Sequence, residues 1–216
     1  MTYGVALILL LSLSLVKSES EFHLWYTDYS EYYVNVYSLA MTDDGYIYAV
    51  GCSYNNNHRT EGLRIYKFRE GTHIWNKLVP YDYDYDYDYA YCYRVYGITI
   101  DNDDGFLTAD YNEFIRDGSF IYGLIVRKYD EDGNTVWEYK QDASFSYFYP
   151  IRMKTLSKGS YAVVGWTSFG NGITVISSTS SMIWRVDISH RYGYGFSGLE
   201  EMGDDSIIAV IGYRFA

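Results

Sequence analysis

The stretch DDGYIYAVG at residues 43–51 decides how this chain folds, because variants of it recur further along. Each variant begins with a polar turn and continues as an apolar strand of four or five residues. The further copies are DDGFLTAD at 103–110, SKGSYAVVG at 157–165 and DDSIIAVIG at 204–212. The strand ends in glycine in every copy except the second, where Asp110 takes its place. A second short strand precedes each copy, as VYSLAM does before residue 43, so each copy predicts a β-hairpin.

Another hairpin follows the first one in the copies that are complete. It is LRIYKFREGTHIW at 63–75 and LIVRKYDEDGNTVW at 124–137, and the third copy has ITVIS and MIW around a serine-rich turn. Gly71 and Gly133 supply the positive φ that tight hairpin turns require. We predict that the tryptophans of these hairpins share one structural position; they are Trp75, Trp137 and Trp184.

Both ends of the sequence contain fragments of the same unit. Trp25, in the segment FHLWYTDY, lies 50 residues before Trp75 and matches the last strand of a repeat. FSGLEEM and IIAVIGYRF match the first two strands of a fourth repeat. The predicted repeats cover residues of about 30–80, 90–142, 150–190, and 196–216 together with 21–28.

These repeats predict the fold class. Four short strands in a repeat of 47 to 62 residues is the size of a β-propeller blade, whose known periods are about 40–50 residues. An aromatic content of 20% with only two prolines also favours strands. The sequence therefore predicts an all-β fold: a β-propeller-like array of about four blade repeats, with the fourth blade split between the N- and C-termini.

The repeat pattern resembles that of a known family. D-G, an apolar strand and G, followed by K-(F/Y)-D-x-x-G-N-x-x-W, is similar to the repeat of secreted seven-bladed β-propeller proteins over most of residues 22–216. The residues that carry the resemblance are Asp44, Gly45, Gly51, Lys67, Phe68, Gly71, Trp75, Lys128, Tyr129, Asp130, Gly133, Asn134 and Trp137. Copies three and four depart from the pattern, and the count is near four rather than seven. Because the members of this family differ in function, the resemblance implies a fold and a secreted compartment but no catalytic residues.

The amino terminus predicts secretion. Residues 5–16 form an apolar run of about a dozen residues, which is too short to span a bilayer. Small residues follow at Ser18 and Ser20, so residues 1–18 are predicted to be a signal peptide that leaves a secreted, extracellular protein with no membrane segment. A buried strand is the alternative for this run.

Secretion also bears on the two cysteines and on glycosylation. Cys52 and Cys92 form a possible disulfide in an oxidising compartment, and two separately buried thiols are the alternative. No Asn-x-Ser/Thr acceptor occurs, while O-linked sugar on residues 177–181 stays open.

Charge and motifs restrict the function. The net charge of −11 argues against nucleic acid as a partner. The four histidines lack metal-site spacing and no nucleophile motif appears, so neither a metal site nor catalytic residues are predicted and the protein is expected not to be an enzyme. Residues 101–105 and 130–134 resemble the start of calcium loops, but they lack the later ligands, and hairpin turns are the preferred interpretation. No cofactor is expected, with calcium a weak alternative.

The run YDYDYDYDY at 81–89 alternates strictly, so in an extended chain its rings lie on one face and its carboxylates on the other. The aromatic stripe consists of Tyr81, Tyr83, Tyr85, Tyr87 and Tyr89. It could stack on sugar rings, contact a neighbouring subunit or gather calcium, and a low-complexity linker is the alternative.

The split repeat predicts how the protein acts. An incomplete sheet has an unpaired edge, and here the missing strands exist at the other terminus. The predicted self-association residues are Phe22, Leu24, Trp25 and Tyr26 at one end and Ile207, Ile208, Val210 and Ile211 at the other. They could close a ring within one molecule or join successive molecules head to tail. The sequence favours a secreted, non-enzymatic structural protein whose partner is itself; the alternative is a monomeric glycan-binding propeller.

Overall fold

The computed structural model is all-β. It describes residues 7–12, 23–28, 33–54, 60–80, 93–103, 105–116, 119–141, 147–189, 194–202 and 206–213, which form sixteen strands and no helix. A helix with the length and apolar character of a membrane span is accordingly absent from these residues.

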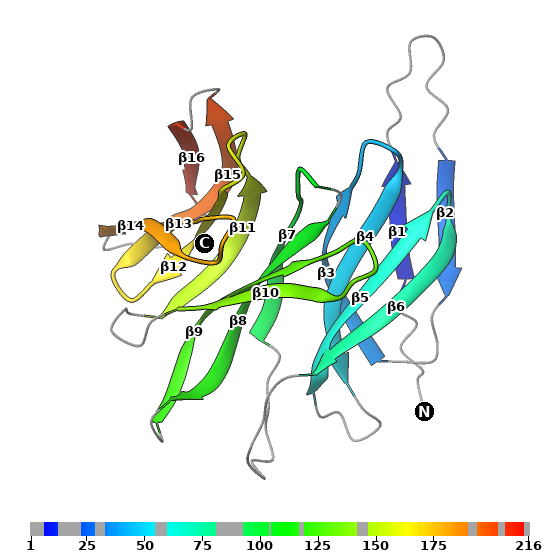
Figure 1. Cartoon of the computed structure of the whole chain (residues 1–216), viewed down its shortest axis with the longest axis horizontal. Helices are drawn as coiled ribbons and strands as arrows, with labels where there is room; N and C mark the ends of the chain where they lie inside the picture. The colour runs from blue at the N-terminus through cyan, green and yellow to red at the C-terminus, as the bar shows by residue number, and fades with distance from the viewer. Residues whose placement is uncertain are drawn as a thin grey trace.

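Twelve of the strands form three antiparallel sheets, in each of which the strands pair in chain order (Figure 1). Sheet 1 contains β3 (Tyr33–Met41), β4 (Tyr46–Tyr54), β5 (Thr60–Arg69) and β6 (Thr72–Pro80). Sheet 2 contains β7 (Tyr93–Ile100), β8 (Phe106–Arg116), β9 (Ser119–Tyr129) and β10 (Thr135–Lys140). Sheet 3 contains β11 (Phe148–Thr155), β12 (Tyr161–Thr167), β13 (Gly170–Ile176) and β14 (Met182–Ser189). The predicted all-β fold of four-stranded antiparallel sheets is confirmed, and it is consistent with a propeller-like arrangement.

The first strand of each sheet is the inner one. β3 contacts β7, β7 contacts β11, and β11 contacts β15, so these strands lie along the middle of the array. β6, β10 and β14 are the outer strands, three positions away in each sheet. The sheets thus stand side by side like the blades of a propeller, with their inner strands together.

Two further hairpins lie at the ends of the array. β1 (Leu7–Ser12) pairs with β2 (His23–Asp28), beside sheet 1. β15 (Tyr194–Met202) pairs with β16 (Ser206–Tyr213), beside sheet 3 (Figure 1). The two hairpins do not join into the split fourth sheet that the sequence predicts, because β2 pairs with part of the apolar run instead. The structure gives residues 7–12 as a strand, the alternative that the sequence left open, and cleavage of residues 1–18 stays a prediction.

The turns explain why particular residues recur. Gly71 and Gly133 have φ of 76° and 74°, as predicted from their hairpins. In sheet 3 the corresponding position is Ser180, with φ of 62°. A backbone hydrogen bond between the nitrogen of residue 42 and the oxygen of residue 46 closes the first turn of sheet 1, and the same bond joins residues 101 and 105 in sheet 2. Gly105 is therefore one position later than Gly45, whose φ is 87°.

The strand register confirms that the three tryptophans share one position. Trp75 lies opposite Lys67, Trp137 lies opposite Lys128, and Trp184 lies opposite Val175. Directly opposite residues of an antiparallel pair project to the same face. All three indoles therefore project from an outer strand toward the side of the next sheet.

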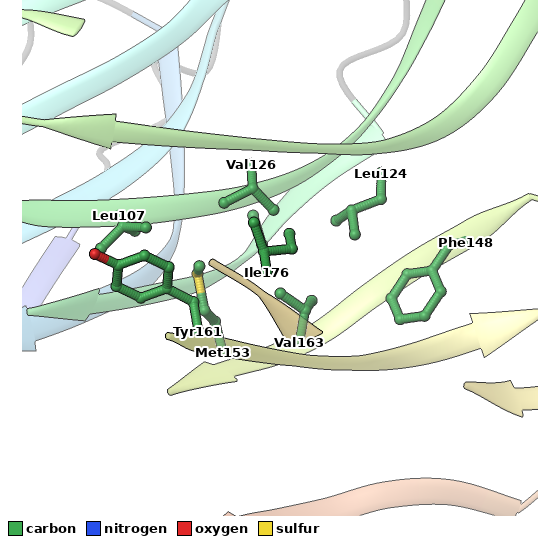
Figure 2. Packing of buried hydrophobic residues seen from close by; sticks show 9 residues of the cluster. Leu107, Leu124, Val126, Phe148, Met153, Tyr161, Val163 and Ile176 are labelled. Atoms are coloured by element: carbon green, nitrogen blue, oxygen red, sulfur yellow. The ribbon is translucent and has the colours of Figure 1, made fainter. Parts of the chain in front are cut away.

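Apolar side chains fill the space between neighbouring sheets. Figure 2 shows Leu124 and Val126 of sheet 2 facing Val163 and Ile176 of sheet 3. The same kind of packing joins sheets 1 and 2, where the Phe106 ring stacks on Tyr48 and on Tyr129, with centroids 4.4 and 4.9 Å apart. Each large side chain buried in this way contributes about 1.5–3 kcal/mol. The inter-sheet layers are therefore the core of the protein.

Asp110 replaces the repeat glycine because the inner strand gives it room. A Cβ built on Gly51 or Gly165 would lie 2.2 or 2.1 Å from a backbone oxygen of the inner strand. In sheet 2 the inner strand has register shifts on both sides of Val95, which is paired with Asp110. Asp110 then forms a buried ion pair with Arg127, at 2.5 Å. Burial raises the pKa of the Asp110 carboxyl above its usual range, against the attraction of the guanidinium.

A buried polar link joins sheets 2 and 3. The Tyr161 hydroxyl donates to Asp101 at 3.0 Å, and Lys128 Nζ lies 2.5 Å from the same carboxylate. Burial and the hydrogen bond to Asp101 raise the pKa of Tyr161. Burial alone would lower the pKa of Lys128, but hydrogen bonds to Asp101 and Asp103 outweigh it, so that this pKa is raised too. The link therefore favours a neutral tyrosine and a charged lysine.

Replacing Tyr161 with phenylalanine tests this link. Loss of the hydrogen bond to a buried carboxylate should lower the free energy of unfolding by about 1–3 kcal/mol at neutral pH. Because the folded-state pKa of Tyr161 is raised, its contribution is complete below the ordinary tyrosine pKa of about 10 and is lost as the pH rises further. Urea unfolding at about pH 7 and about pH 11 should therefore show a smaller difference between the two proteins at the higher pH. An unchanged difference would contradict the titration of Tyr161.

Candidate functional site: the end faces of the array

The structure places the predicted terminal residues on two separate hairpins. Leu24, Trp25 and Tyr26 lie in β2, paired with residues 9–11 of β1. Phe22 lies outside the described residues. The predicted residues of the other end lie in β16 and pair with β15; they are Ile207, Ile208, Val210 and Ile211. The two sets are not brought together within one molecule.

The other predicted site residues are described in part. The aromatic stripe at 81–89 and Cys92 lie outside the described residues. Cys52 is fully buried between sheets 1 and 2 and is disulfide-bonded. Its pairing with Cys92 stays a prediction.

The end face of sheet 1 is covered over only part of its width. Tyr66 and Phe68, on the third strand, are buried on the face that points away from sheet 2. On the inner strand β3, Leu39 and Met41 lie opposite Ala49 and Ile47, so they project from this same face. Leu39 is nevertheless 52% exposed and Met41 50% exposed. Leu78 of the outer strand, opposite Arg64 on this face, is 37% exposed, so the most exposed part of the face is its inner strand.

The end face of sheet 3 shows the opposite pattern. Val175 and Ile173 are buried in a cluster that includes Leu199 of β15. Trp184 and Val186, on the outer strand β14, lie opposite Val175 and Ile173 and project to the same side. Their side chains are 41% and 46% exposed. Here the inner part of the face is covered and the outer strand is not.

The counterparts of Trp184 show what normally covers this position. The Trp137 ring lies 5.8 Å from the ring of Tyr161 in the next sheet. Trp75 meets the hairpin turn between the third and fourth strands of sheet 2, since a Cβ on Gly133 would lie 2.7 Å from its ring. Neighbours from the following sheet, including its second hairpin, therefore cover the indole. Trp184 is the tryptophan of the three with no such cover among the described residues.

The sequence indicated these positions only in part. The equivalence of the tryptophans was visible in the repeat, and exposure of Trp184 follows once the neighbouring hairpin is known to lack two strands. Leu39 and Met41 were missed. The signal that could have found them is alternation in VYSLAM, where residues 39 and 41 share a face of the first inner strand of the array.

Asp101 and Asp130, in the two segments that resemble calcium loops, are engaged within the fold. The carboxylate of Asp130 accepts hydrogen bonds from the backbone and side-chain nitrogens of Asn134, at 2.7 and 2.8 Å. Asp101 binds Lys128 and Tyr161 as described above. Both segments that resemble calcium loops are thus hairpin turns, and no group of three or more His, Cys, Asp or Glu residues within the described ranges is placed to hold a metal ion.

Comparisons with known proteins support the fold alone. No known protein family and no curated protein sequence matches the chain. A solved structure of a protein of unknown function from Bacteroides caccae is similar over 88% of this chain, with a TM-score of 0.51 and 12% sequence identity. The chain spans 57% of the length of that protein.

The predicted pairing of the cysteines can be tested directly. Peptide mapping without reduction should recover one cross-linked peptide that contains Cys52 and Cys92. The Cys92→Ser variant should lose about 2–4 kcal/mol of unfolding free energy, the usual contribution of a disulfide. Recovery of Cys52 in an unlinked peptide or linked to a second molecule would contradict the pairing.

Proposed function

We propose that this is a secreted, non-enzymatic structural protein that associates head to tail into an extracellular filament or oligomer. The observation that carries the proposal is that the two end faces of the array leave apolar side chains exposed at different, complementary positions. Sheet 1 exposes apolar side chains on its inner strand, and sheet 3 exposes them on its outer strand. Exposed apolar patches of this kind mark surfaces for protein contacts.

One shared sheet between two molecules would cover both patches. β15 and β16 correspond to the first two strands of a repeat, and Trp25 in β2 corresponds to the tryptophan of the last strand. A three-stranded fourth blade, with β2 of the next molecule paired beside β16 in the third position, would lie between the two end faces. Its inner strands would cover Leu39 and Met41 of the next molecule, and its outer strand would cover Trp184.

The predicted signal cleavage agrees with this arrangement. Removal of residues 1–18 would take β1 away from β2. The edge of β2 that β1 occupies would then be free to pair with another strand. None of the described strands pairs with the second edge of β16, which makes that edge the acceptor.

Association between molecules fits the geometry better than closure within one molecule. β2 and β16 lie at opposite ends of the array, with three sheets between them (Figure 1). A contact between unlike surfaces repeats from molecule to molecule, and it propagates as a filament unless the rotation closes a ring.

The magnitudes indicate that side chains and strand pairing are both needed. Complete burial of a large apolar side chain contributes about 1.5–3 kcal/mol, and Leu39, Met41, Trp184 and Val186 are already about half-buried. Together they supply about 3–6 kcal/mol, whereas association costs about 4–15 kcal/mol in lost translation and rotation. The backbone hydrogen bonds of the β2–β16 pair must contribute the remainder.

The Trp184→Asp variant tests the outer patch. A carboxylate in place of the indole would be buried without a partner, so the fraction of assembled protein should fall at least about tenfold at micromolar concentration. Sedimentation velocity and electron microscopy measure the assembled fraction. Ile74→Asp is the matched control, because Ile74 is a comparably exposed apolar residue on the outer strand of sheet 1. Equal assembly of the Trp184→Asp variant and the control would contradict the proposal.

Deletion of residues 21–28 tests the strand donor. The shortened protein should stay folded but should not form filaments or long oligomers, since the donor strand is missing. A synthetic peptide of residues 21–28 should also inhibit assembly of the full chain, whereas a peptide of the same composition in scrambled order should not. Assembly that survives the deletion unchanged would exclude the terminal-strand mechanism.

A further inference from the structure

A groove runs along the inner strands of the array. It has a volume of about 1150 Å³ and is lined by β3, β7, β11 and β15 together with the first turns of sheets 1 and 2. Small-molecule pockets usually measure about 300–1,000 Å³, so this groove is large enough for several linked rings. The free edges of the inner strands also face it, and their backbone groups add donors and acceptors.

Two charged side chains on the groove wall have no partner among the described residues. Arg152 on β11 is exposed and makes neither a hydrogen bond nor an ion pair there. Asp43, in the first turn of sheet 1, is likewise exposed and unpaired. The other basic residue of the wall, Lys154, is instead paired with Glu200. Within the described part of the chain, the groove therefore holds an unpaired guanidinium and an unpaired carboxylate.

The remaining lining mixes polar and apolar side chains and contains no aromatic ring. The apolar residues are Leu39, Ala40, Met41, Ile98, Ile100, Met153 and Leu199, and the further carboxylates are those of Asp44, Asp101 and Glu200. Ser38, Thr99 and Asn102 contribute polar side chains to the wall. A ligand of this groove has no ring to stack on, so charge and hydrogen bonds supply its recognition beside contacts with aliphatic side chains. An arginine fork selects a planar or tetrahedral anion, and a carboxylate accepts hydrogen bonds from hydroxyl groups.

We infer that the groove binds an acidic oligosaccharide, with the anionic group of the sugar on Arg152 and a sugar hydroxyl donating to Asp43. A carboxylate and a sulfate ester share the chemistry that Arg152 recognises. The size of the groove, the polar residues of its wall and the unpaired Arg152 and Asp43 agree with a hydroxylated chain that carries a localised anionic group. The net charge of −11 opposes anions in general, so binding depends on the local guanidinium.

Isothermal titration calorimetry with three tetrasaccharides tests this assignment. The probes are tetragalacturonic acid, a sulfated galactotetraose and neutral galactotetraose. At least one acidic probe should bind about tenfold or more tightly than the neutral one at low salt, and the difference should shrink as salt is added. The affinities of the carboxylated and the sulfated probe are then compared, and the tighter one identifies the anionic group that the groove recognises.

Variants connect the binding to the groove. Arg152→Gln should abolish the preference for the acidic probe, and Arg152→Lys should retain part of that preference. Asp43→Asn should lower the affinity for all three probes. The control is Arg69→Gln, because Arg69 is an exposed arginine outside the groove. Equal affinity for acidic and neutral probes, no binding up to about 1 mM, or an Arg152→Gln variant that keeps the preference would each overturn the inference.

Binding can be separated from self-association by variants, although Leu39 and Met41 belong both to the groove and to the end face. The titration is made on the native chain and on the Trp184→Asp variant, whose substitution lies outside the groove lining. Loss of assembly without loss of binding would support both proposals. Binding of the acidic probe by a Trp184→Asp variant that still assembles would leave the groove assignment standing and count against the end-face interaction.

Discussion

Each sheet of this protein is apolar on both faces, and the rest of the structure depends on that constraint. In β4, Tyr48 and Val50 pack toward sheet 2, while Ile47 and Ala49 pack on the opposite face. A sheet of this kind is stable only with a neighbour on each side, which is why repeated sheets stack into an array. The consequence appears at the ends, where a face that requires a neighbour has only part of one.

The same constraint explains how polar groups enter the layers. Between sheets, a buried charge persists only with partners that replace water. Asp101 meets Lys128 and Tyr161, and Asp110 meets Arg127. These links are costly if broken. The end face of sheet 1 follows the same rule, since its buried Arg64 donates hydrogen bonds to Asn76 and Ser53. The ends thus differ in chemistry from the ordinary surface of the molecule, and they match the inter-sheet layers.

Much of the fold could be predicted from the sequence, because its signals are local. Alternation, polar turns and glycines at positive φ depend on neighbouring residues, and the positions of Gly71, Gly133 and the three tryptophans were confirmed. The link through Asp101 could not be predicted, since its partners come from a different strand and a different sheet. The pairing of β2 with β1 also escaped prediction, because an apolar run suits a signal peptide and a strand equally well. Alternation in the sequence assigns Leu39 to one face of its strand, but its exposure depends on what lies beside the array, which no local pattern records.

The location of the groove connects the two proposals physically. The inner strands line the groove, and Leu39 and Met41 lie on its wall as well as on the uncovered end face of sheet 1. In the proposed assembly, β15 and β16 of the neighbouring molecule lie against that face. They would extend the wall of the groove and bury Leu39 and Met41. Asp43 lies in the first turn of sheet 1, next to that contact, whereas Arg152 lies on sheet 3, away from it. Association would therefore lengthen the groove and leave Arg152 uncovered, so a filament of this protein would present the same guanidinium once in every subunit.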